Sequence, residues 1–88
     1  MAKPSNQQNG LWMARQQAGL RQKSVARLLG HKSTSMISEY ETGKLLPSLP
    51  TALKLAAIYN RSIGDLYPDL NSMILTQLRS VKEQFTNR

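Results

Sequence analysis

Side chains that can bind anions are concentrated in the first half of the chain. They are the cationic, amide and hydroxyl residues Arg21, Gln22, Lys23, Arg27, Lys32, Ser33, Thr34, Ser35, Ser38, Thr42 and Lys44. Ammonium and guanidinium groups bind phosphate oxygens through charge-assisted hydrogen bonds, and amide and hydroxyl groups donate to the same oxygens. Hydroxyl groups also accept hydrogen bonds, so they can contact several kinds of base edge. This segment therefore predicts contact with a phosphate-bearing polymer.

The net charge agrees with this prediction. Twelve Lys and Arg oppose five Asp and Glu in 88 residues, which gives a formal charge of +7. Residues 1–44 hold seven basic and two acidic side chains, whereas residues 45–88 hold five and three. Such an excess is costly to a compact fold and is typical of proteins that bind polyanions, with nucleic acid ahead of membrane. We expect the anion-binding surface in the first half.

The inventory of reactive residues argues against catalysis and against a metal ion or other cofactor. The chain has no cysteine, a single histidine (His31) and no glycine-rich phosphate loop. Asp65 and Asp69 form the only close acidic pair outside the segment described above, and Asp65 is placed to cap a helix. No run of about 18 apolar residues occurs, and residues 1–10 lack the apolar part of a signal peptide. We expect no enzyme, no cofactor, no metal and no membrane contact.

Glycine and proline divide the chain into segments whose apolar residues recur every three or four positions, which predicts helices. The expected helices run from Asn6 or Gln8 to Ala18, from Arg21 to Leu29, from the polar segment 31–35 to Gly43, from the Ser48 cap to Tyr59, from the Ser62 cap to Pro68, and from Leu70 to Phe85. A chain of this length forms one small domain. The predicted fold is all-α, with a compact five-helix domain and a C-terminal amphipathic helix.

The same spacing predicts which faces are buried. Val25, Leu28 and Leu29 share one face of the second helix, and Ile37 and Tyr40 anchor the third. The apolar stripe of the fourth helix consists of Leu49, Ala52, Leu53, Ala56 and Tyr59.

Two short helices joined by a tight polar turn outline a helix-turn-helix. A wider set of residues extends this outline: Arg15, Gly19, Leu20, Gln22, Val25, Ala26, Leu29, Gly30, Ile37, Glu41, Thr42, Gly43, Lys44, Pro47 and Ser48. From Leu11 to Tyr67 the chain resembles the DNA-binding domain of the phage repressor and Cro-like (XRE-type) helix-turn-helix family. The resemblance implies a repressor-like domain over residues 9–68, with the third helix in the major groove of double-stranded DNA. The turn before Ile37 is one residue longer than is usual in the family.

The resemblance also implies roles for the anion-binding side chains. Base contacts are expected from Thr34, Ser35, Ser38 and Glu39, and phosphate contacts from Gln22, Lys23, Lys32, Ser33, Thr42 and Lys44. Gln22 opens a helix, where free N–H groups and the helix dipole attract a phosphate; the alternative is an ordinary exposed polar residue. Glu39 can accept from cytosine N4. Glu39 could instead weaken non-specific phosphate binding, or pair with a neighbouring cation.

Arg15 and Glu41 each lie on an otherwise apolar stripe. The resemblance implies that they form a buried ion pair, which joins the first helix to the end of the third. A guanidinium group can bind both oxygens of a carboxylate at once. We therefore expect a structural role for this pair.

Residues 1–8 are expected to form a flexible arm, and residues 69–88 lie beyond the family domain. The last helix carries the apolar stripe Ile74, Leu78, Val81 and Phe85. A single domain of this size reads only a few base pairs, so a two-fold dimer is expected, and the stripe is its predicted surface. The stripe could instead pack on the domain's own core near Trp12, or bind another protein.

These features together predict a sequence-specific transcriptional regulator that acts as a repressor. It is expected to bind a palindromic operator as a homodimer, in the cytoplasm and on the nucleoid. The alternative is an antitoxin or regulatory adaptor that binds a protein partner through its last helix.

Overall fold

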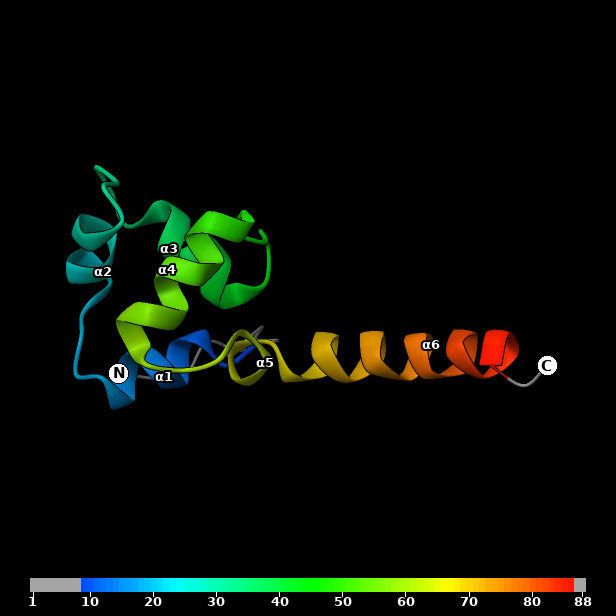
Figure 1. The fold of residues 1–88 in the computed structure, drawn as a ribbon. Coiled ribbons are helices and arrows are strands. Elements are labelled where there is room, and N and C mark those ends of the chain that lie inside the picture. The colour runs from blue at the N-terminus through cyan, green and yellow to red at the C-terminus, as the bar shows by residue number, and fades with distance from the viewer. Residues whose placement is uncertain (1–8, 87–88) are drawn as a thin grey trace.

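Residues 9–86 are described in the computed structural model, and they form six α-helices with no strand among them. The helices are α1 (Leu11–Gln17), α2 (Gln22–Leu28), α3 (Ser35–Thr42), α4 (Leu49–Tyr59), α5 (Ile63–Leu66) and α6 (Pro68–Thr86). The first five pack together, and α6 projects from them as a rod (Figure 1). We call residues 9–67 the head. The predicted all-α class is confirmed, and the expected arm 1–8 lies outside the described residues.

The first helix is shorter than expected. It begins at Leu11, so the predicted start at Asn6 or Gln8 is wrong. The Leu11 N–H donates to Oδ1 of Asn9 at 2.9 Å, which satisfies one of the free N–H groups at the helix start. Asparagine favours this local bond over a helical conformation of its own, which explains why the helix does not extend further back.

The start of the head is attached to its other elements by two further bonds. The Asn9 amide donates to the Tyr40 carbonyl at 2.8 Å, and the Gly10 N–H donates to the Leu66 carbonyl at 2.7 Å. A β-carbon at Gly10 would lie 2.8 Å from the Asp65 carbonyl oxygen, closer than such atoms approach. Glycine is therefore required at this position, and the two ends of the head are joined there.

Serine caps begin the two helices that close the head. Ser48 accepts from the Thr51 N–H, and Ser62 forms the predicted capping box with Asp65. α5 ends before Pro68 as expected, but Pro68 then opens α6, two residues earlier than predicted. Proline suits the first position of a helix because that position needs no N–H donor.

The core lies between α1, α2, α3, α4 and α5. Its buried residues are Leu11, Ala14, Val25, Ala26, Ile37, Tyr40, Leu55, Tyr59 and Leu66. The predicted faces of α2 and α4 are partly wrong, because Leu28, Leu49 and Leu53 are 61%, 67% and 53% exposed. Leu55, outside the predicted stripe, is only 1% exposed. α4 has leucines on more than one side, and helical spacing alone does not select which side meets α1 and α5.

α6 leaves the head at its first turn and meets mainly α5. Ile74, Leu78, Val81 and Phe85 are all exposed. The alternative in which this stripe folds back on the core near Trp12 is therefore not the arrangement of the structure.

Candidate nucleic-acid interface

The helix-turn-helix consists of α2, a six-residue turn and α3. Val25 and Ala26 bury one face of α2 against α3, and the small alanine permits a close approach of the two helices. In the turn, Gly30 has φ of 78°, a left-handed conformation that glycine adopts without strain. The His31 N–H donates back to the Ala26 carbonyl at 2.8 Å. These contacts fix the direction in which α3 leaves α2.

α3 divides into a buried face and an exposed face. Ile37, Tyr40 and Glu41 are buried, whereas Ser35, Ser38 and Glu39 are exposed. Of the four residues predicted to contact bases, these last three share the outward face. The fourth, Thr34, is the half-buried residue that precedes the first turn of α3.

Arg15 and Glu41 are brought together at the centre of the head. Nε of Arg15 lies 2.6 Å from Oε2 of Glu41, and Nη2 donates to Oε1 at 3.2 Å. Both side chains are 2% exposed. The third guanidinium nitrogen, Nη1, donates to the Leu20 carbonyl at 3.0 Å, so each nitrogen of the group has a partner. The pair connects α1 to the end of α3 and to the loop before α2.

Gln22 is connected to the same ion pair, a contact that the sequence did not indicate. Its Nε2 donates to Oε1 of Glu41 at 3.1 Å. A side-chain amide has two hydrogens, and the second is available to another acceptor. Because Gln22 is also the first residue of α2, its backbone N–H lies at the positive end of that helix. The amide is thereby held at the place where a phosphate is expected.

The negative charge of Glu41 also acts on a neighbouring tyrosine. Burial raises the pKa of Tyr59, and the Glu41 carboxylate raises it further, while Arg15 opposes the change. Tyr59 therefore stays neutral over the physiological range and contributes to the core as an uncharged ring.

The other predicted phosphate-binding residues are distributed over α2, the turn, α3 and the loop after it. Lys23, Lys32, Ser33 and Lys44 are exposed. The Ser33 hydroxyl accepts from the Ser35 N–H at 3.4 Å, which leaves its own hydrogen free to donate. The Thr42 hydroxyl instead donates to the Ser38 carbonyl at 3.0 Å, so in this conformation its hydrogen is already engaged.

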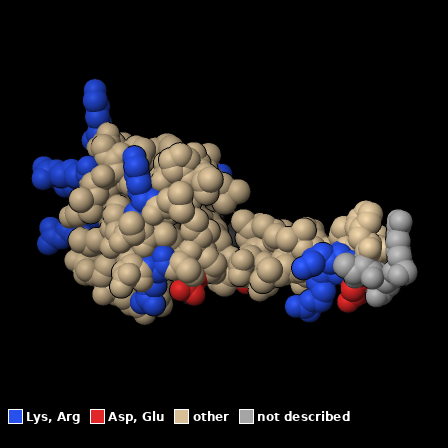
Figure 2. Space-filling view, viewed as in Figure 1, with Lys and Arg blue, Asp and Glu red and all other residues tan. Residues whose placement is uncertain are grey.

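Basic side chains stand out from the part of the head that carries α2 (Figure 2). Arg21, Lys23 and Arg27 belong to this helix and its cap, and each is exposed. They surround the helix that presents Gln22. The positive charge predicted from the sequence is thus located beside the helix-turn-helix.

A family model described as "Helix-turn-helix" matches residues 13–66, more than half of the chain. The match begins within α1, contains all of α2, the turn, α3 and α4, and ends with α5. The chain belongs to the XRE-type helix-turn-helix family. No curated protein matches the chain closely enough to be counted as a relative.

Membership of the XRE-type family indicates what the chain does. The protein is a DNA-binding transcription regulator of the XRE type. Within residues 9–86, His, Asp and Glu do not gather in any group of three that could hold a metal ion. Over the same residues, no helix has the length and apolar character needed to cross a bilayer.

Proposed function

We propose that this XRE-type protein is a homodimeric repressor that reads a palindromic operator through the major groove. The observation that carries the proposal is the outward face of α3, where Ser35, Ser38 and Glu39 are exposed. In helix-turn-helix proteins the second helix of the motif enters the major groove and the first crosses the phosphate backbone. The described geometry is compatible with that docking.

Base contacts in this proposal come from Thr34, Ser35, Ser38 and Glu39. The carboxylate of Glu39 can accept from cytosine N4, and the Thr34 methyl group can contact the thymine methyl. Serine hydroxyls bind several base edges, so their discrimination is modest. One head therefore distinguishes few sequences, and a second head on a symmetric half-site increases the specificity.

Phosphate contacts come from Gln22, Lys23, Lys32, Ser33 and Lys44. Gln22 is the strongest of these, because Glu41 orients its amide beside the N-terminus of α2. Thr42 is a weaker candidate than the sequence implied, since its hydroxyl hydrogen is already donated to a carbonyl.

Dimerisation is assigned to α6. Its stripe of Ile74, Leu78, Val81 and Phe85 is exposed along the projecting rod, and exposed apolar surface of this kind marks a binding site. A protein partner of different sequence, as in an antitoxin, would use the same face. Repression follows from simple occupancy, because a dimer bound at a promoter blocks access to it.

Selection of bound sites from random duplexes at near-physiological salt tests the DNA-reading proposal. We expect two inverted half-sites in the selected sequences. Glu39→Gln should change the preferred base at one position of each half-site, whereas Lys44→Ala should weaken binding to all sequences equally. A uniform loss from Glu39→Gln, with unchanged preference, would contradict base reading by Glu39.

Sedimentation of the full chain tests the dimer. Leu78→Glu should convert the dimer to a monomer, because it places a charge in the middle of the stripe. Thr76→Glu adds the same charge to the opposite side of α6 and should leave the dimer intact. A monomeric wild-type chain at micromolar concentration would exclude the homodimer and favour a different protein partner for α6.

A further inference from the structure

Asn9 is the one asparagine in the chain that is followed by glycine, and the pair lies where the two ends of the head are joined. Asparagine is among the thermally labile residues of proteins. The backbone nitrogen of the next residue can attack its side-chain carbonyl carbon, and glycine permits this attack most readily because it has no β-carbon. A chemically labile pair therefore lies at a structural joint.

The fold itself requires this glycine. A β-carbon at Gly10 would lie 2.8 Å from the Asp65 carbonyl oxygen and 3.5 Å from the Leu66 carbonyl oxygen, so a side chain does not fit there. A bulkier residue after asparagine would slow the attack, but the close approach between the start of α1 and α5 excludes it. The lability of Asn9 is thus a consequence of the way the head closes.

In the closed head, hydrogen bonds hold the groups that would react. The attacking atom is the Gly10 nitrogen, and its N–H donates to the Leu66 carbonyl at 2.7 Å. The Asn9 amide donates to the Tyr40 carbonyl at 2.8 Å, and the amide oxygen accepts from the Leu11 N–H at 2.9 Å. Ring closure moves the Asn9 side chain onto the Gly10 nitrogen, so it requires these bonds to break.

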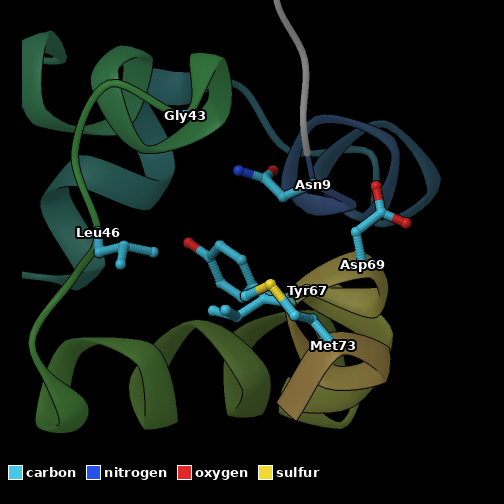
Figure 3. A pocket seen from close by; sticks show the side chains of 7 residues that line it. Asn9, Gly43, Leu46, Tyr67, Asp69 and Met73 are labelled. Carbon is cyan, nitrogen blue, oxygen red and sulfur yellow. The ribbon is translucent and has the colours of Figure 1, made fainter. Parts of the chain in front are cut away.

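The Asn9 side chain also borders an open cavity of about 510 Å³ (Figure 3). It points from the start of α1 towards the end of α3, where Gly43 lies. Water is the second reactant in deamidation, and the open cavity brings water to this side chain. The hydrogen bonds of the joint, rather than access of water, therefore limit the reaction.

We propose that Asn9 is a deamidation site that is protected while the head is closed and reacts when the start of α1 detaches. In the open state the Gly10 nitrogen bonds to Cγ of Asn9, the bond from Cγ to Nδ2 breaks, and ammonia leaves with the proton of the Gly10 nitrogen. Water then hydrolyses the succinimide ring. Cleavage at Cγ gives aspartate at position 9, and cleavage at the backbone carbonyl gives isoaspartate, in which the main chain continues through Cγ.

Both products prevent the head from closing as before. An aspartate carboxylate has no hydrogen to donate, so a negative oxygen faces the Tyr40 carbonyl oxygen in place of the amide donor. Isoaspartate lengthens the main chain before Gly10, and the contact with the Asp65 carbonyl leaves no space for the displaced backbone. The reaction is irreversible, so each deamidated chain records an earlier opening of its head.

The joint also bears on DNA binding, because Tyr40 belongs to α3. Loss of the Asn9 bond separates the start of α1 from the helix that carries the proposed base contacts. This effect on DNA binding rests on the proposed function, whereas the reaction at Asn9 does not.

Tandem mass spectrometry of the full chain, incubated in warm, mildly alkaline buffer, locates the reaction and measures its rate. A synthetic peptide of residues 4–15 gives the rate without the fold. Asn9 should react at least about a hundredfold more slowly in the chain than in the peptide, because only the open fraction reacts. Urea below the unfolding transition should raise the rate in the chain steeply. Equal rates in chain and peptide, or a peptide that does not react, would overturn the proposal.

Asn9→Asp reproduces the aspartate product. It should lower the melting temperature and weaken binding to the duplex selected above about tenfold, because a buried hydrogen bond is lost. Asn71→Asp is the matched control, since it adds the same charge at an exposed asparagine of α6 and should lower neither quantity. Equal melting temperatures for the two variants would overturn the claim that the product prevents closure. A lower melting temperature with unchanged DNA affinity would keep the deamidation site and contradict the proposed DNA contacts of the head.

Discussion

Glu41 joins three elements through one carboxylate. It accepts two hydrogen bonds from Arg15 and one from Gln22, so α1, the start of α2 and α3 meet at its two oxygens. Because the group is buried, each of these bonds replaces water that the folded chain excludes. The residue that anchors α3 thus also orients a proposed phosphate contact.

Arg15→Ala should lower the thermal stability before it alters any DNA contact. The substitution leaves the Glu41 charge buried without its partner, which typically costs about 3 to 5 kcal/mol. Thermal and urea unfolding monitored by circular dichroism measure the change. Arg21→Ala removes an exposed cation of the same type and should change stability by less than about 1 kcal/mol. An unchanged melting temperature for Arg15→Ala would show that the ion pair contributes no net stability.

The raised pKa of Tyr67 leads to a prediction about the stability of the protein at high pH. Burial, with a smaller effect from Tyr40, raises the pKa of Tyr67 to about 12, and its hydroxyl has no partner among the described residues. Because the folded-state pKa lies above the ordinary value of about 10, the stabilising contribution is complete below pH 10 and is lost as pH rises towards 12. Unfolding by urea at a series of pH values should show Tyr67→Phe losing less stability over this interval than the wild type. Identical losses would contradict the raised pKa.

At the scale of the helices, the sequence predicted where helices end better than it predicted which of their faces are buried. Ser48, Ser62 and Gly43 act through local chemistry, and they cap or terminate helices where the sequence predicted. The buried side of α4 depends on neighbours distant in the chain, and the prediction chose Leu53 over Leu55. The start of α1 was also missed, because a side-chain bond of Asn9 ends the helix earlier than apolar spacing indicates.

The candidate site likewise has features that the sequence predicts and features that it does not. The outward position of Ser35, Ser38 and Glu39 follows from helical spacing once Ile37 and Tyr40 are placed inside. The bond between Gln22 and Glu41 joins residues 19 positions apart, and no local pattern contains it. Such contacts become visible only when the helices are packed.

Gly43 ends α3 and directs the chain into the loop that carries Lys44. Its φ is 81°, and the Gly43 N–H donates to the Tyr40 carbonyl at 3.2 Å. Gly43→Ala should therefore destabilise the head by about 1 to 2 kcal/mol, which is the cost of a side chain in this conformation. Chemical denaturation measures the loss.

Gly64→Ala is the control for this substitution. Gly64 lies within α5, and a β-carbon there would come 3.2 Å from the exposed Asn71 side chain, which can move away. The expected change is small, because alanine is also the better helix former. Equal losses at both positions would mean that the left-handed conformation of Gly43 carries no special cost.

On the scale of the whole molecule, the charge distribution predicts a salt-dependent affinity. Five exposed cations lie on or next to the helix-turn-helix: Arg21, Lys23, Arg27, Lys32 and Lys44. If each neutralises one phosphate, the logarithm of the binding constant should fall with the logarithm of salt concentration at a slope of about −4 to −5 per head. Fluorescence anisotropy with a labelled duplex measures the slope. Lys44→Ala should reduce its magnitude by about 1, and Lys54→Ala, an exposed cation on α4, should leave it unchanged.

The bond between Gly10 and Leu66 sets the order of events while the chain is being made. α1 is synthesised first, but the carbonyl that receives the Gly10 N–H is added at the end of α5. At about 5 to 20 residues per second, the interval is about 3 to 11 s. The α2–α3 turn can form during that time, because its contacts are local. α6 follows Leu66 directly, so the helix that would recruit a second copy leaves the ribosome only after every part of the head has been made.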